Sequence, residues 1–456
     1  MNGQKSLLRH AFEGFGITFF GDALYKVTGV VTTFLVLAWV EPYDYGIWRL
    51  LLSALSAMSI VALTGISGIA VADIARELGK GEKARAYAVM WRIALIIISA
   101  SVVAAVVLAL AAPVISFVSK IHLTLYLWVL AGSLLVAGMV SVLQVFFQAR
   151  LEPMKALILK NVGNLAYLVG LILLLPYLKL GVLGLAVAYT LSVIIPVLVF
   201  LPYALKEFRE MRAARDRSAY PLKEVLVRRG GWALASDYVS IIESSAWPWI
   251  VGYFLSIVQV GYAGLAIVIV SQIYSLVPIQ YLLRAILPRF ADDAGRMQEW
   301  LSRGMKYSLW IHLVVAGVVI AGASLVLPAF FPRYAVALPL AALLLIGVPF
   351  RAIGAVLTEW FYAARKQKEL FLTTAMPRAG ALLLLPFLLW SFGMNGFVMW
   401  YLLSSVSIVL SRLALARAEV RPTLDGASLC IPDRRDMELI RRVIIRAKEA
   451  VVSQAS

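Results

Sequence analysis

Two charged residues interrupt the first long apolar run of the chain. The run covers residues 11–40, and Asp22 and Lys26 lie near its middle. Four residues apart on a helix, their side chains share a face and can pair. A charge at the centre of a membrane span costs about 2.5–3.5 kcal/mol. Either the two charges only neutralise each other, or Lys26 binds an anion while Asp22 keeps the ammonium charged and oriented.

More ionisable residues lie near the centres of later apolar runs. Arg351 and Arg378 lie in two consecutive runs, and Glu243 lies in an earlier one. On a helix, Asp237, Glu243 and Trp247 fall within about a third of the circumference, so this face is expected to meet water or charge. Long basic side chains reach water from the membrane centre less easily than from helix ends. These residues therefore predict a polar cavity inside the membrane.

Two other arginines, Arg49 and Arg284, lie nearer the ends of their runs. There a basic side chain could bind substrate or anchor the helix at the membrane interface. The cations assigned to substrate binding are Lys26, Arg49, Arg284, Arg351 and Arg378. The acidic residues that could line the cavity or bind a coupling ion are Asp22, Asp237, Glu243 and Glu359. Nothing in the sequence selects between H+ and Na+ as that ion.

The composition indicates a membrane protein throughout. Of 456 residues, 62% are hydrophobic and 15% are charged, whereas soluble domains average about 45–50% apolar and about 25% charged residues. We expect an all-α polytopic membrane protein, because a span needs roughly 20 apolar residues. The twelve expected spans are 11–40, 46–74, 93–118, 123–148, 157–176, 182–204, 232–256, 262–284, 307–328, 336–361, 371–390 and 397–415.

The basic residues are distributed unevenly between the loops. Most of the 42 Lys and Arg residues fall in the terminal segments and alternate loops on one side, including the tail from Arg412, whereas Lys120, Lys179 and Arg333 fall on the other. Basic loops stay in the cytoplasm, so both termini are expected on the cytoplasmic side. The protein itself is expected in the cell membrane. Topology thus explains the net charge of +17, and we expect no nucleic-acid partner.

The two halves of the chain repeat. The sequence FFQAR at 146–150 recurs as FYAAR at 361–365, and Gly46 of YDYG corresponds to Gly261 of VQVG, both at a spacing of 215 residues. Both repeats begin on the cytoplasmic side. We therefore expect two six-helix lobes related by a parallel pseudo-twofold axis around a central cavity, an arrangement found in secondary transporters.

The predicted domains follow this repeat. They are an N-terminal six-helix lobe at 1–205, a basic cytoplasmic linker at 206–231, a C-terminal six-helix lobe at 232–417 and a cytoplasmic tail at 418–456. Within the tail, residues 436–452 have an apolar helical stripe flanked by basic residues. This amphipathic helix could lie on anionic membrane lipids or dock on the cytoplasmic loops.

No residues assemble into a catalytic or metal-binding motif. The three histidines, His10, His122 and His312, are scattered, and Cys430 is the single cysteine. The sequence contains no phosphate-binding loop of the ATPase type. We therefore expect a protein that is not an enzyme and needs no cofactor or metal.

Several passages resemble one transporter family. EPYDYGIW after the first span, GIAVADIARELGKGE after the second, and the segment from LKEVLVRRGGWALASDYV to AILPRFADDAG resemble Wzx-type oligosaccharide-lipid flippases. These flippases belong to the multidrug/oligosaccharidyl-lipid/polysaccharide (MOP) exporter superfamily. The resemblance covers essentially all twelve spans.

The resemblance implies a substrate and a mechanism. It implies two six-helix lobes arranged in a V, with a central cavity that opens alternately inward and outward. This basic cavity would hold the phosphate and sugars of a polyprenyl-(pyro)phosphate-linked glycan. Basic residues in helices 1, 2 and 8 of the family match Lys26, Arg49 and Arg284 in position. It also implies a monomer that works with other polysaccharide-assembly proteins.

Two rival functions remain open. A cation-coupled multidrug exporter of the same superfamily would need an acidic or aromatic cavity, whereas Lys26, Arg351 and Arg378 outnumber the acidic residues near the membrane centre. A polytopic glycosyltransferase or polymerase would need a sizeable external loop, and every expected external loop is a few residues long.

Overall fold

A computed structural model describes residues 24–61, 71, 74–75, 77–150, 152–213, 231–277, 283, 287 and 293–419. The regular elements in these ranges are helices. They are Leu24–Trp39, α2 (Pro42–Val61), α4 (Lys83–Ser119), α5 (Thr124–Ala149), α6 (Pro153–Ile172), the π-helical η1 (Leu173–Tyr177), α7 (Gly181–Ala213), α9 (Gly231–Phe254), α10 (Ile257–Leu276), α12 (Ala294–Phe330), the 3-10 helix η4 (Pro332–Tyr334), α13 (Ala337–Leu344), the 3-10 helix η5 (Leu345–Gly347), α14 (Val348–Ala363), α15 (Gln367–Phe392) and α16 (Met394–Glu419).

These helices confirm the predicted all-α membrane architecture. In the described part of the chain, nine helices are long and apolar enough to span a membrane. The other three predicted spans coincide with the helix Leu24–Trp39, with α2 and with α9. The chain is therefore a multi-pass membrane protein. Several helices extend beyond the predicted spans: α4 begins at Lys83, α12 begins at Ala294, and α7 continues to Ala213, in the segment predicted as a linker.

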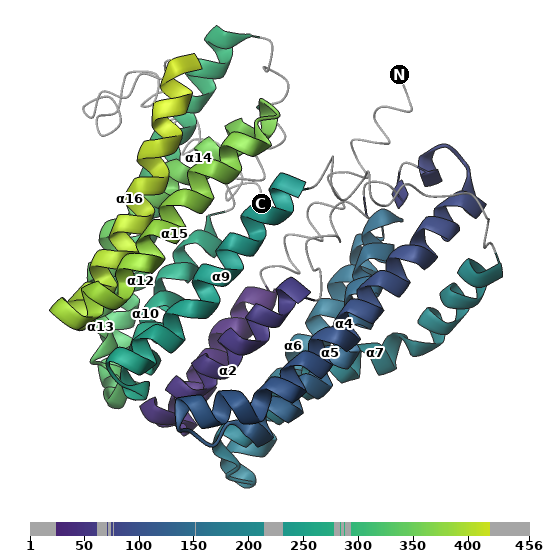
Figure 1. Ribbon diagram of the computed structural model, residues 1–456, viewed down its shortest axis with the longest axis horizontal. Coiled ribbons are helices and arrows are strands. Elements are labelled where there is room, and N and C mark those ends of the chain that lie inside the picture. Colours follow the sequence, from purple (N-terminus) through teal and green to yellow (C-terminus); the bar gives the residue numbers. More distant parts are fainter. Residues whose placement is uncertain are drawn as a thin grey trace, which may run out of the picture. The chain divides into compact units, whose positions relative to one another are not determined.

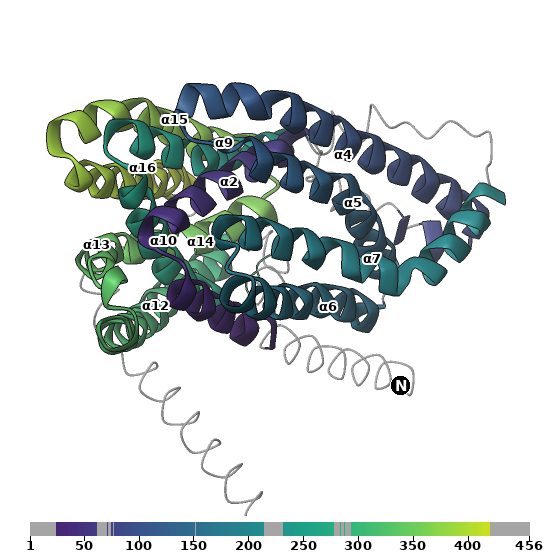
Figure 2. The same cartoon turned by 90° about the horizontal axis from the view of Figure 1, so that it is seen from below.

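The chain divides into two compact units. The first comprises Met1–Leu265, Val326–Leu338 and Leu382–Phe397, and the second comprises Ala266–Leu325, Pro339–Ala381 and Val398–Ser456. Within the first unit, α5 packs against α4 and α7, and α6 packs against α7 (Figures 1 and 2). Gly163 permits a close approach of α6 to α7, since a Cβ there would lie 2.7 Å from the carbonyl oxygen of Ser192.

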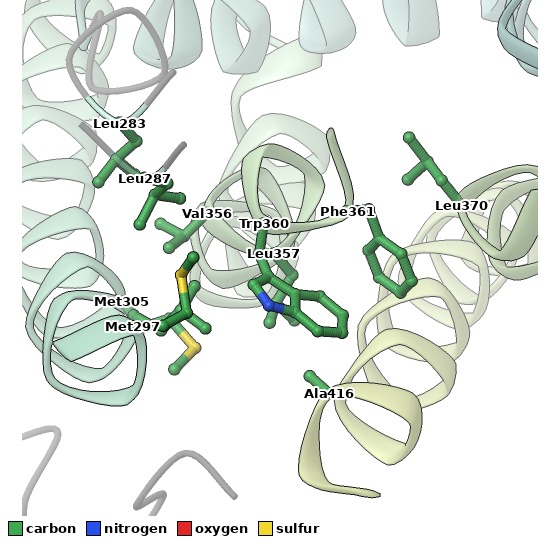
Figure 3. Packing of buried hydrophobic residues seen from close by; sticks show 11 residues of the cluster. Leu283, Leu287, Met297, Met305, Val356, Leu357, Trp360, Phe361, Leu370 and Ala416 are labelled. Carbon is green, nitrogen blue, oxygen red and sulfur yellow. The ribbon is translucent and has the colours of Figure 1, made fainter. Parts of the chain in front are cut away.

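The core of the second unit is built around α14. Trp360 and Phe361 are buried, and Trp360 packs edge-on to Phe361 with ring centroids 4.7 Å apart. Met297 and Met305 of α12 and Ala416 of α16 belong to the same buried cluster (Figure 3). The described residues of α12 and α16 are thereby held against α14, which also carries Arg351 and Glu359 of the predicted site.

A polar network joins α4, α5 and α7 at the end predicted to be cytoplasmic. Arg150, which ends α5, binds the carboxylate of Glu207 through both terminal nitrogens, at 2.6 and 2.5 Å. It also donates to the hydroxyls of Tyr203, at 2.9 Å, and Tyr87, at 3.0 Å. Burial alone would lower the pKa of Arg150, but the hydrogen bonds and charge of Glu207 raise it above its ordinary value. The arginine that ends the FFQAR motif is thus the centre of an ion-pair network.

Candidate functional site

Two glycines bring the beginnings of α2 and α10 into direct backbone contact. A Cβ on Gly46 would overlap the carbonyl oxygen of Ile257, and a Cβ on Gly261 would lie 2.5 Å from that of Pro42. Gly46 corresponds to Gly261 in the repeat, and Pro42 corresponds to Ile257 at the same spacing. The contact is therefore reciprocal, as between surfaces related by a twofold axis.

Arg49 lies one turn further along α2, against its own counterpart in the repeat. A Cβ on Gly264, 215 residues later, would lie 2.7 Å from Nε of Arg49. A residue that touches its equivalent lies near the axis. Nε of Arg49 is buried without a hydrogen-bond acceptor among the described residues, while the Tyr45 hydroxyl interacts with the guanidinium.

The same end of the first unit is closed by contacts with η4. Arg333 pairs with Glu41 and donates to the carbonyl oxygen of Ala38 at 3.3 Å. The hydroxyl of Tyr334 donates to the carbonyl oxygen of Val40 at 2.9 Å, and its ring packs edge-on to that of Tyr45. Sequence reasoning placed Arg333 only in an external loop. Its partner, which precedes α2, could not be identified without the fold.

The remaining predicted residues of the first unit differ in exposure. Lys26 is half-buried on the helix Leu24–Trp39, and Asp22 lies outside the described residues. On α9, Glu243 is buried but Asp237 is exposed, and Trp247 packs on Phe397 with ring centroids 5.2 Å apart. Of the helical face predicted to meet water or charge, Asp237 is thus at the surface, whereas Glu243 and Trp247 are in the interior.

In the second unit, Arg351 is held by neutral groups. Its Nε donates to the Ser405 hydroxyl at 3.1 Å, and its guanidinium lies 4.3 Å from the ring centroid of Tyr401 and 5.9 Å from that of Tyr274. Stacking on aromatic faces stabilises a guanidinium that has lost water. Because no described carboxylate pairs with Arg351, its positive charge is not cancelled within the described part of this unit.

Arg412 is a buried cation that sequence reasoning missed. It was counted with the cytoplasmic tail, but α16 continues to Glu419 and leaves Arg412 only 8% exposed. It donates to the Gly354 carbonyl at 3.0 Å and to the hydroxyls of Thr358 at 2.8 Å and Thr374 at 2.9 Å. Arg412 follows Ser405 by seven residues, two helical turns, so the two side chains lie on one face of α16. This spacing is the feature of the sequence that could have indicated that Arg412 faces the same neighbours as Ser405.

Arg378 and Glu359 belong to the same unit. Arg378 is half-buried on α15, one turn after Thr374. Its positive charge repels that of Arg412. Glu359 is buried on α14. Arg284 lies outside the described residues. The predicted site residues are therefore distributed over both units, with Lys26, Arg49, Asp237 and Glu243 in the first and Arg351, Arg378 and Glu359 in the second.

The described side chains include several arginines with neutral partners. Within the described ranges, no group of three or more His, Cys, Asp or Glu residues is placed to hold a metal ion. Arg49, Arg351 and Arg412 present guanidinium groups among neutral partners. Such groups attract phosphate or carboxylate.

Comparisons with known proteins give a family match and a shared fold. The model of the family described as "Polysaccharide biosynthesis protein" matches residues 11–294. An inward-facing multidrug resistance MATE family transporter of the MOP superfamily is 15% identical, with 89% of this chain and 96% of that chain covered and a TM-score of 0.74.

Two further solved structures share the fold. The lipid II flippase MurJ in an inward closed conformation is 13% identical, with 92% of this chain and 89% of that chain covered and a TM-score of 0.65. The MATE multidrug transporter DinF-BH, solved as a complex, is 19% identical, with 91% of this chain and 96% of that chain covered and a TM-score of 0.61. No curated protein matches the chain. These likenesses show that the chain has the fold of these three proteins.

Proposed function

The chain belongs to the polysaccharide biosynthesis protein family, and we propose that it moves a polyprenyl-(pyro)phosphate-linked oligosaccharide from the inner to the outer leaflet. The protein is a membrane transporter with the MOP fold. Within the proposal, it acts by alternating access in the assembly of a cell-surface glycan. The lipid tail stays in the bilayer while the phosphate and sugars cross inside the protein.

The observation that carries this proposal is the set of partly or fully buried guanidinium groups with neutral partners. Arg49, Arg351 and Arg412 form no ion pair with a described carboxylate. Moving a phosphate through hydrocarbon without counter-charge is prohibitive. Arginine binds phosphate through two parallel hydrogen bonds, and its charge does not titrate near neutral pH. An anionic head group is the cargo that this excess of positive charge would suit.

Reconstitution into liposomes tests the proposal. A fluorescent polyprenyl-pyrophosphate glycan is placed in one leaflet, and an impermeant quencher added to the other side reports its arrival there. We expect label to become accessible in proteoliposomes that contain the protein and to stay protected in protein-free liposomes and with Arg49→Ala. Equal rates with and without protein would contradict the proposed function.

A cation-coupled drug exporter is the competing function. Buried Glu243 and Glu359 are the residues that favour it, because a carboxylate can exchange a proton or Na+ for a cationic drug. The same proteoliposomes decide between the two when they are given a cationic dye and an ion gradient. We expect no dye accumulation above that of protein-free liposomes.

The topology gives a separate prediction. A cysteine placed at Ser218 in the linker, in a Cys430→Ser background, should be protected from an impermeant external thiol reagent in intact cells, since the basic loops are expected to be cytoplasmic. A cysteine at Lys179, in a loop predicted to be external, should react. Labelling of the Ser218 cysteine in intact cells would reverse the assigned orientation.

Lys26 is expected to contact the phosphate of the substrate. A charged hydrogen bond is typically worth about 1.5–3 kcal/mol, so Lys26→Ala should lower transport roughly ten- to a hundredfold, and Lys26→Arg should retain part of it. Transport and membrane expression are measured together. If Lys26 and Asp22 are only a structural pair, replacing both with Leu should preserve transport in a well-expressed protein.

A further inference from the structure

Polar and aromatic side chains from two helices of the first unit meet around Tyr25. Lys160 of α6 places its ammonium 3.8 Å from the ring centroid of Tyr25 on the helix Leu24–Trp39. One turn further along α6, Asn164 donates to the backbone carbonyl of Tyr25 at 3.2 Å. Tyr25 remains 37% exposed. A charged amine, an amide and a partly open aromatic ring are therefore held together in a segment predicted to cross the membrane.

The same α6 face continues into a row of aromatic rings. Tyr167 follows Lys160 by seven residues, roughly 10 Å along the helix axis. Its ring packs edge-on to Tyr189 of α7 with centroids 6.5 Å apart, and Tyr189 packs edge-on to Trp48 of α2 at 6.1 Å. Tyr167 and Tyr189 are half-buried, whereas Trp48 is buried. The row thus has a closed end at Trp48 and partly exposed tyrosines between it and Lys160.

Core packing alone does not explain the composition of this row. Phenylalanine would fill the same space without a hydroxyl to desolvate, and burying an unsatisfied hydroxyl or amide costs about 1–3 kcal/mol on protein mutational scales. Tyr25, Tyr167 and Tyr189 are instead not fully buried, and each carries a hydroxyl on its aromatic ring. Surfaces of this kind suit a ligand that is apolar on one face and hydroxylated at its edge.

We propose that the row formed by Tyr25, Lys160, Asn164, Tyr167 and Tyr189 is the subsite for the sugar rings nearest the phosphate. This inference rests on the proposed function. The C–H face of a pyranose carries slight positive charge and suits the negative face of an aromatic ring. The tyrosine hydroxyls and the Asn164 amide can bond the sugar hydroxyls at the ring edge. Lys160 supplies a counter-charge for the phosphate or for an acidic sugar.

Two lipids that differ only in their sugars test this subsite. The purified full-length protein is titrated with polyprenyl pyrophosphate and with a polyprenyl-pyrophosphate disaccharide, and binding is followed by the shift in melting temperature. Two stacking contacts correspond to a preference for the glycosylated lipid of about tenfold. Replacing both Tyr167 and Tyr189 with Leu should reduce that preference to within about twofold. Replacing both with Phe should reduce the preference less than Leu does, because the rings remain and only the hydroxyls are lost.

Tyr177→Leu is the matched control for loss of an aromatic ring in the same unit. Tyr177 is 76% exposed, so this variant should keep the full preference, and the melting temperatures without ligand report whether each variant is folded. Survival of the preference in the double Leu variant would overturn the subsite. Equal binding of both lipids by the unmodified protein would overturn the subsite but leave the flippase function standing. Binding of neither lipid would overturn both.

Discussion

Gly46→Ala should abolish transport by forcing apart the beginnings of α2 and α10. The new Cβ would overlap the carbonyl oxygen of Ile257 and lie 2.9 Å from a side-chain methyl of the same residue. A backbone carbonyl held in a helix cannot move aside as a flexible side chain can, so the helices must separate. Alanine is better than glycine in a helix by about 1 kcal/mol, so loss of function would be steric in origin.

Accessibility of a buried position on α2 measures this separation. Ser53 is 5% exposed, and a cysteine there, in a Cys430→Ser background, should be protected from an impermeant external reagent. With Gly46→Ala the same cysteine should react, and transport in proteoliposomes should fall by more than tenfold. Gly261→Ala should act in the same direction, because its Cβ would approach the carbonyl oxygen of Pro42.

Gly132→Ala on α5 provides the matched control. A Cβ at Gly132 would meet nothing within 4 Å, so this variant should transport normally and keep the Ser53 cysteine protected. Normal transport by Gly46→Ala, with the cysteine still protected, would contradict this prediction. It would show that the contact between α2 and α10 tolerates a side chain at Gly46 and does not close this end of the protein.

The helices that could be predicted from the sequence are those determined by the hydropathy of a short stretch of chain. Hydropathy over about 20 residues defines a span, and helices occur in each of the twelve predicted positions. The correspondence of Gly46 with Gly261 was visible as a repeat spacing. The structure adds that these two residues touch, which the spacing alone could not reveal. Interruption of apolar runs by Lys26, Arg49 and Arg351 likewise predicts membrane-embedded cations from position alone, and this remains a prediction.

The residues that sequence reasoning missed depend on contacts between distant helices. Arg412 appeared to begin a basic tail, and its burial follows from acceptors on α14 and α15. Lys160 was counted only as a loop charge, yet it lies over Tyr25, 135 residues earlier in the chain. The loop charges were explained sufficiently by topology, so neither residue was singled out. Such assignments require helix packing, which a single sequence does not encode locally.

The repeat also predicts equivalence where the structure shows difference. Arg150 and Arg365 close the two matching motifs, FFQAR and FYAAR. Arg150 is bound by Glu207, Tyr203 and Tyr87. Arg365 is exposed, with a backbone φ of 58°, and has no ion pair with a described residue. The arginine that ends this motif therefore stabilises helix packing in the first half but is exposed in the second.

This difference gives the second large prediction. Arg150→Ala should destabilise the protein by about 3–5 kcal/mol, because it leaves the Glu207 carboxylate, 5% exposed, without its counter-charge. Arg365→Ala, at the equivalent position, should cost less than about 1 kcal/mol, as expected for an exposed side chain outside such a network. Thermal unfolding of the purified variants in one detergent compares them directly.

A double variant separates the ion pair from the rest of the network. Replacing Arg150 with Met and Glu207 with Leu removes both charges, so the free energy of unfolding should recover much of what Arg150→Ala loses. The recovery should be incomplete, since the hydroxyls of Tyr87 and Tyr203 also lose the guanidinium donor. Glu207→Leu alone should also lower the free energy of unfolding, because it leaves the guanidinium in place with only those hydroxyls as partners. If Arg150→Ala proved as stable as Arg365→Ala, the network would not be what holds α4, α5 and α7 together.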